Sequence, residues 1–432
     1  MKKFTFQAGC AAMIVAAMVL SLSGCTKNKD NGSPAFSQDY VVFAWNDLGM
    51  HCLNPTYDKA VILPPYNNLV AQVVLRGNPP QIVTDGITIE YRIIGNTTSY
   101  DKRGYGGFWD NVTALFGISS LQHDVGLTGN RLSGTMQAAS GHFEATGIPV
   151  TPVNDMGVWD PLQVAELIVK DESGKTLATT RATVPTSDDI NCAKCHGNDA
   201  FNDVLREHDD EEGTSLMQAK PVLCAKCHGS PALGQTGRGT AGTYLSEAIH
   251  GFHADKGASC YDCHPGNTTK CNRSEKHTAA DGNCVRCHGS AGQVASSTKS
   301  GRIPWVNEPA CSSCHAGVTD AGSTTVLYRN STGHGDMMCT ACHGSPHAMV
   351  PSLKDADNYQ AMQYQPYSKS PKTLGSCGTC HGSSRGEDEI DEYAEVHGGS
   401  NPEKENGCFI CHTSVETNTA KWPHAFTWQD SN

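Results

Sequence analysis

The sequence is poor in the side chains that usually fill a protein core. Of its 432 residues, 38% are hydrophobic and 7% are aromatic. A chain of this length is long enough for two or three domains, but this composition leaves it short of apolar material for a conventional core. We therefore expect something other than side chains to fill part of the interior.

Clusters of basic residues are lacking beyond the first few positions, and the formal net charge is −12. Because binding to nucleic-acid phosphates needs clustered Lys and Arg, this pattern argues against nucleic acid as a partner. Long apolar runs are lacking as well. The one mostly apolar segment, residues 11–22, is too short to span a bilayer comfortably.

The N-terminus is typical of an export signal. Two lysines follow Met1, the apolar segment comes next, and the sequence LSGC, which ends at Cys25, resembles the lipobox of bacterial lipoproteins. The resemblance implies a signal peptide over residues 1–24 and acylation of Cys25, which would anchor the protein to a membrane surface. Thr26 follows, and by resemblance to Gram-negative sorting rules this implies the outer membrane or cell surface. The alternative is a plain cleaved signal with an incidental cysteine.

Residues 25–36 are polar and turn-rich, as in a tether, and residues 37–186 have a β pattern. Short runs rich in Val, Ile and aromatics are separated by Gly, Asn and Pro: DYVVFAW, LVAQVVLRG, ITIEYRIIG, GHFEATGI and VAELIVKD. At the end of the region, AELIVK, DESGK and TLATTRATV predict a hairpin. We expect an antiparallel β-sandwich-like domain that serves as a docking or spacing module.

From residue 187 to residue 432 the strand pattern stops, and the motif CxxCH occurs eight times. The first cysteines of successive motifs are 24 to 38 residues apart. Chance predicts roughly 0.04 such motifs in a chain of this composition. The cysteines are Cys192, Cys195, Cys224, Cys227, Cys260, Cys263, Cys284, Cys287, Cys311, Cys314, Cys339, Cys342, Cys377, Cys380, Cys408 and Cys411, and the histidines are His196, His228, His264, His288, His315, His343, His381 and His412.

Zinc and haem both use paired cysteines at this spacing. Tandem CxxC pairs could form four tetrathiolate zinc sites, but zinc needs no histidine after the second cysteine, and every pair here has one. In c-type haem attachment, the two thiols add to the haem vinyl groups and the histidine becomes the proximal iron ligand. An export signal also favours thiols that are already bound to a cofactor or metal, because free thiols oxidise outside the cytoplasm.

The region therefore resembles a multihaem c-type cytochrome, of the outer-membrane lipoprotein type found in metal-reducing bacteria. The resemblance implies eight haems c, around which a mostly irregular and α-helical domain is organised. Their porphyrins would supply much of the apolar core that the side chains lack.

Eight further histidines lie in this region outside the motifs, as many as there are haems, and they are candidate distal ligands. These are His208, His250, His253, His277, His334, His347, His397 and His424. Any one of them could be an ordinary surface residue, but together they predict mostly bis-histidine haems. His250 is the least secure, because His253 is three residues away on one expected helix. Met217, Met337, Met338 or Met349 could replace one histidine, although packing is the more usual role of methionine.

Two cysteines remain after the haem and lipid sites are assigned and Cys10 is removed with the expected signal peptide. Cys52 and Cys271 predict a disulfide between the two domains, and two buried free thiols are the alternative. Cys52 ends the sequence NDLGMHC, in which Met50, His51 and Cys52 could suggest copper. Consecutive residues of a strand point to opposite sides, so a structural role is favoured.

The histidine count favours an electron carrier over an enzyme. The carrier would pass electrons along its haems to redox partner proteins or an extracellular acceptor such as a mineral. Octahaem enzymes that act on nitrite, hydroxylamine or tetrathionate keep one haem open, and some carry CxxCK, which this sequence lacks. A subunit of a cytochrome filament is the third alternative.

Overall fold

The computed structural model describes residues 39–364, except 78, 191, 266–268, 278–283 and 315–325, together with residues 379–380. The expected signal peptide, tether and lipidated Cys25 lie outside these residues. All described residues belong to one compact unit that begins at Gln38. In the part of the chain that the structure describes, every helix is too short or too polar to cross a membrane.

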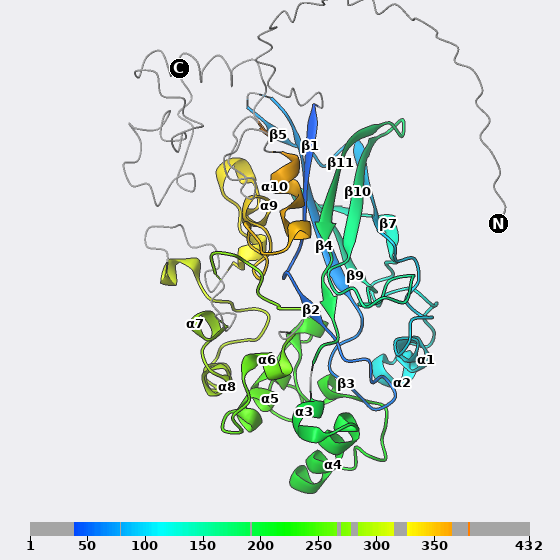
Figure 1. Cartoon of the computed structure of the whole chain (residues 1–432), viewed down its shortest axis with the longest axis vertical. Coiled ribbons are helices and arrows are strands. Elements are labelled where there is room, and N and C mark those ends of the chain that lie inside the picture. Colours follow the sequence, from blue (N-terminus) through cyan, green and yellow to red (C-terminus); the bar gives the residue numbers. More distant parts are fainter. Residues whose placement is uncertain are drawn as a thin grey trace, which may run out of the picture. The chain divides into compact units, whose positions relative to one another are not determined.

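Two antiparallel sheets form the N-terminal region (Figure 1). The first contains, in order, β1 (Tyr40–Asn46), β4 (Asn67–Leu75), β9 (His142–Ile148) and β8 (Gln137–Ala139), with β5 (Gln81–Ile82) also paired to β4. The second contains β11 (Thr176–Thr183), β10 (Val164–Asp171), β6 (Ile87–Ile93) and β7 (Ser133–Thr135). The long strands lie where the sequence predicts them, and β10 and β11 form the expected hairpin.

The core of this region lies between the two sheets. Along β6 and β10, buried and more exposed residues alternate, because successive side chains of a strand point to opposite faces. Ile89 and Leu167 from one sheet, and Leu69 and Phe143 from the other, belong to the same buried cluster. This core holds much of the chain's buried apolar side-chain material.

A second apolar cluster joins the β region to the segment that carries the CxxCH motifs. Phe108 and Leu115, from the short helices α1 (Gly107–Asp110) and α2 (Val112–Phe116), pack with Tyr57 and with Leu223. Leu223 lies in β13 (Val222–Leu223), which pairs in parallel with β3 (Ala60–Val61). Likewise, β12 (Thr186–Ser187) pairs with β2 (His51–Cys52). The chain on either side of the predicted boundary at residue 187 is therefore in direct contact, and the division into two domains stays a prediction.

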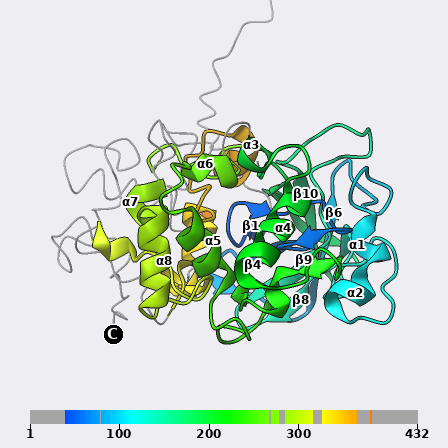
Figure 2. The ribbon, with the colours of Figure 1, turned by 90° about the horizontal axis from the view of Figure 1, so that it is seen from below.

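Helices after this point are mostly short. They are α3 (Ala193–His196), α4 (Ala200–Glu212), α5 (Leu245–His253), α6 (Cys260–Cys263), α7 (Cys284–His288), α8 (Ala291–Lys299), α9 (Cys339–His343) and α10 (Tyr359–Gln363). Figure 2 shows α5 and α8 side by side. Strands are nearly lacking among the described residues beyond 187, where β13 spans two residues.

Helix α10 lies beside β1 (Figure 1), and side chains of α10 and of the residue after it bond to one edge strand of each sheet. Tyr364 Oη bonds both the amide and the carbonyl of Val42 on β1, and the Ala44 amide donates to Gln360 Oε1 at 2.9 Å. Gln363 donates to the Thr179 carbonyl of β11 at 2.8 Å. Because β1 and β11 are edge strands, these bonds satisfy backbone groups that would otherwise invite pairing with another chain.

Replacing Ile89 with Ala should destabilise the sheet region by roughly 2–5 kcal/mol, because the fully buried side chain would leave a cavity between the sheets. The neighbouring exposed Thr88 supplies the control, and Thr88→Ala should change stability by no more than about 0.5 kcal/mol. Denaturant unfolding followed by far-ultraviolet circular dichroism measures both changes. Equal losses in the two variants would contradict the assigned core.

Candidate haem-binding sites

The described CxxCH motifs form single helical turns. The turns include α3, α6, α7 and α9, and the 3-10 turns η1 (Cys224–Lys226) and η3 (Cys311–Ser313). Residues three apart on a helical turn lie on the same side. Both thiols of a motif can therefore reach one bound group, and the histidine follows at the end of the turn.

Four motif histidines lie opposite four of the spare histidines. Each pair joins a residue of a CxxCH motif to a residue outside the motifs, and the partners come from separate parts of the chain. The pairs are His196–His253, His228–His208, His264–His250 and His288–His347, with ring centres 6.3, 6.3, 5.9 and 6.1 Å apart.

This separation is the one that two axial ligands of a single metal ion need. A metal–imidazole bond of about 2 Å on each side, with about 1 Å from nitrogen to ring centre, places the ring centres about 6 Å apart. Edge-to-face rings elsewhere in the structure have similar separations, such as Tyr57 and Phe108 at 5.7 Å. The four pairs are therefore compatible with bis-histidine ligation of iron, and what sets them apart is that each joins a motif histidine to a spare one.

Hydrogen bonds hold the Nδ1 atom in six of these eight rings, at distances of 2.7 to 3.1 Å. The partners are the Asp203 carboxylate for His196, the carbonyls of Ser246, Ile249 and Leu48 for His250, His253 and His347, and the hydroxyls of Thr214 and Thr243 for His208 and His228. Metal-bound histidines characteristically bond through the ring nitrogen that does not bind the metal. These bonds fix Nδ1 and leave Nε2 for iron.

The protein also favours the neutral, ligand-competent form of several rings. Desolvation, followed by neighbouring histidines, lowers the pKa of His264 and of His288, although both residues are exposed to solvent. Desolvation lowers the pKa of His228, His250 and His347 in the same direction. Because a metal binds unprotonated imidazole, these shifts favour ligation at neutral pH.

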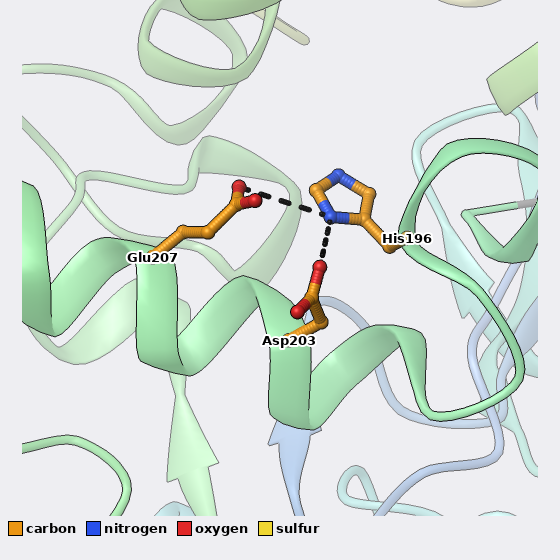
Figure 3. Close-up of side chains that lie close together, drawn as sticks. All are labelled: His196, Asp203 and Glu207. Atoms are coloured by element: carbon orange, nitrogen blue, oxygen red, sulfur yellow. Dashed lines mark hydrogen bonds and ion pairs between the residues drawn. The ribbon is translucent and has the colours of Figure 1, made fainter.

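Two carboxylates, from Asp203 and Glu207, lie close to the His196 ring (Figure 3). Its Nδ1 lies 3.0 Å from Asp203 Oδ2 and 3.8 Å from Glu207 Oε2, and both acidic residues belong to α4. The hydrogen bond with His196 is the main cause that lowers the pKa of Asp203, and Arg206 adds to it. An ionised carboxylate on Nδ1 makes the imidazole a stronger electron donor to a metal.

Thiols of different motifs are close neighbours. Burial, followed by Cys260 and Cys271, raises the pKa of Cys284 to about 11. Burial, followed by Cys263, raises the pKa of Cys192. Attachment points of the first, third and fourth motifs are therefore adjacent. No set of four thiolates, as a zinc site would need, forms among the described cysteines, and the one cluster of potential metal ligands that the described residues form is His196, Asp203 and Glu207.

His250 and His253 both lie on α5 but face different motif histidines. Their closeness in sequence, the reason for doubting His250, is therefore no obstacle to two separate ligand roles. His250 faces His264 of the motif that directly follows, whereas His253, which is nearer to that motif in sequence, faces His196 of the first motif.

Several predicted ligands fall outside the description. Outside the described residues lie three motif cysteines, three motif histidines, two spare histidines and the side chain of a third: Cys377, Cys408, Cys411, His315, His381, His412, His397, His424 and His334. His277 is described, and its Nδ1 lies 3.3 Å from Ser274 Oγ.

Cys52 and Cys271 are free thiols in the structure. Burial, followed by Cys271 and Asp189, raises the pKa of Cys52 well above its usual value, so the two thiols lie in one another's neighbourhood. A disulfide between them stays a prediction. The adjacent His51 is 2% exposed and its Nε2 lies 2.7 Å from Asp47 Oδ1, as expected for a structural residue.

A family model described as cytochrome c3 matches residues 252–344. The matched segment contains His253 and the third to sixth motifs, from Cys260 to His343. The match supports a multihaem c-type cytochrome, with covalently bound c-type haem and electron transfer as its chemistry. Comparisons with curated proteins and with solved structures gave no match.

The sequence did not predict the groups that hold the rings. Asp203 is one of several acidic residues on α4, and nothing in the sequence distinguishes it from Asp209 or Glu207. Backbone carbonyls such as Leu48 carry no sequence signal at all. Only the folded chain brings these acceptors to the histidines.

Asp203→Asn should raise the reduction potential of one haem, because loss of the negative charge on Nδ1–H destabilises ferric iron. We expect a shift of tens of mV, since a tenfold change in relative stability corresponds to about 59 mV for a one-electron couple. Glu207→Gln is the control, because Glu207 is half exposed and farther from Nδ1. Potentiometric titration measures both, and an equal shift in the two variants would contradict the special role of Asp203.

Proposed function

We propose that this protein is an exported, lipid-anchored electron carrier that binds eight haems c and passes electrons along them to an acceptor outside the cell. The observation that carries the proposal is the pairing of motif and spare histidines at about 6 Å, four times over. The equal numbers of motifs and spare histidines, eight of each, support proposing the same arrangement for the remaining motifs.

Haem supplies a reversible one-electron change at iron. The described histidine pairs would hold the haem iron between two neutral imidazoles, which would leave no place at the metal for water or a substrate. An iron with two fixed imidazoles changes little in structure between its oxidation states. Such ligation supports a carrier rather than an enzyme.

The neighbouring thiols support transfer from one haem to the next. Cys192 lies near Cys263, and Cys284 lies near Cys260, so the attachment points of three motifs are contiguous. Cys311 and Cys339 of the fifth and sixth motifs are also neighbours, and burial followed by Cys311 raises the pKa of Cys339. Electrons pass efficiently only between closely spaced groups, and a small protein domain that packs several haems provides that spacing.

The destination of the electrons is inferred from the sequence. The lipobox-like segment before Cys25 and the following threonine support attachment at the outer membrane. The net charge of −12 supports low potentials, because acidic groups stabilise ferric iron, and such potentials suit delivery to minerals or to partner proteins. Contacts of the β region with the motif region support a role in presenting the haems to a partner.

Low-temperature EPR of the fully oxidised holoprotein, with haem counted by intact mass in the same sample, tests the proposal. Eight haems with only low-spin bis-histidine signals are the expected result. A stoichiometric high-spin signal would mean that one iron is open, as in the octahaem enzymes that act on nitrite, hydroxylamine or tetrathionate. A haem count below eight would contradict the assignment of every motif.

Replacing His250 or His253 with Ala should each open one haem, and the two variants should open different haems because the rings face His264 and His196 respectively. EPR should show one high-spin haem in each single variant and two in the double variant. His123→Ala, at an exposed histidine of the β region, is the control and should leave all haems low-spin. A double variant that shows only one high-spin haem would contradict the assigned pairs.

A further inference from the structure

The loop that contains NDLGMHC lies in the β region but contacts a candidate haem ligand. It connects the end of β1 at Asn46 to β2, which begins at His51. Asn46 Oδ1 accepts hydrogen bonds from the amides of Leu48, at 3.0 Å, and of Gly49. A short side chain that bonds the backbone two and three residues ahead fixes the shape of a turn. These two bonds restrain the backbone of the loop from within its own sequence.

This turn presents one carbonyl to His347. The Leu48 oxygen accepts from the His347 backbone amide at 3.3 Å and from its ring Nδ1 at 3.1 Å. The first bond fixes the position of the residue, and the second fixes the ring's orientation and tautomer. With Nδ1 as donor, Nε2 is the nitrogen available to iron on the side of His288, whose ring centre is 6.1 Å away.

Gly49 allows the loop and His347 to approach this closely. A Cβ atom at position 49 would lie 3.1 Å from the Ala348 nitrogen and 3.2 Å from the His347 carbonyl carbon. Both neighbours are backbone atoms, so they cannot move aside without moving the ligand. The φ angle of +86° also disfavours any other residue.

Arg273 ties the same two segments together from the motif region. Its Nη1 donates to the Gly49 carbonyl at 2.7 Å, and its backbone amide donates to the His347 carbonyl at 2.7 Å. The guanidinium is held by the Asp357 carboxylate at 2.8 and 2.9 Å, and the two side chains are 1% and 2% exposed. A buried ion pair joined by two hydrogen bonds has little freedom to shift.

We propose that the loop from Asn46 to Cys52 is a positioning element for the distal ligand His347, and that Gly49 and the Leu48 carbonyl set the ligation of the haem attached at Cys284 and Cys287. This inference rests on the proposed pairing of His288 with His347. It assigns the β region a direct part in the coordination of one haem, in addition to any contact with a partner.

The test compares four forms of the full-length holoprotein: wild type, Gly49→Ala, Gly86→Ala and His347→Ala. Gly86 is the matched control, because its φ of +69° carries the same backbone cost while nothing lies within 4 Å of the added Cβ. We expect His347→Ala to give one high-spin haem by EPR, and Gly49→Ala to give the same species in a substantial fraction of molecules. Added imidazole should restore the low-spin signal in both. Gly86→Ala should remain entirely low-spin with an unchanged haem count.

The outcomes separate this inference from the function on which it rests. If His347→Ala remains entirely low-spin, the pairing itself is wrong. If His347→Ala opens a haem but Gly49→Ala remains entirely low-spin, the pairing stands and the positioning role of the loop is overturned. Should Gly49→Ala fail to yield haem-loaded protein, Asn46→Ala, which removes the turn's side-chain acceptor without adding bulk, takes its place and should give the same partial high-spin signal.

Discussion

The spacing of about 6 Å between two imidazole rings, which would admit one iron between them, recurs in four described pairs and is the constraint that the proposed function places on the motif region. Each described pair joins residues from separate parts of the chain, and the separation in sequence ranges from 14 residues for His250 and His264 to 59 for His288 and His347. Such pairs can form only when loops of many different lengths return to specified positions. If these pairs ligate iron as proposed, the need to reach ligand positions accounts for the short helices and few strands among the described residues of this region.

The β region contains the larger of the two apolar side-chain cores that the described residues form. Its two sheets bury a continuous apolar cluster. One edge strand of each sheet, β1 and β11, bonds to the side chains of Gln360, Gln363 and Tyr364. The Arg273–Asp357 pair adds a buried anchor, since Thr183 of β11 also donates to Asp357 at 2.7 Å. A sheet structure in contact with the loops that carry candidate ligands can hold those loops in place. The same contacts make the boundary between the two regions less distinct than the change in composition at residue 187 suggests.

The hydrogen-bond partners of the rings differ in a way that bears on electron transfer. His196 bonds a carboxylate, His347 and His253 bond carbonyls, and His228 bonds a hydroxyl. The electron donation of an imidazole increases with the basicity of the group that its Nδ1–H bonds, so the haems are expected to have graded potentials. In the proposed carrier, this gradation would give electrons a preferred direction along neighbouring sites.

The sequence by itself determined the chemistry. CxxCH fixes two thiols and one imidazole within five consecutive residues, and alternating Val and Ile residues locate the strands, because both patterns are local. Which spare histidine faces which motif was decided by tertiary structure alone: His253 lies just before Cys260 in sequence but faces His196. The same holds for Asp203, Leu48 and Gly49, whose roles come from what they approach in space. The side chain alone decides whether a residue can be a ligand, whereas the second histidine that it faces depends on the path of the chain between the two.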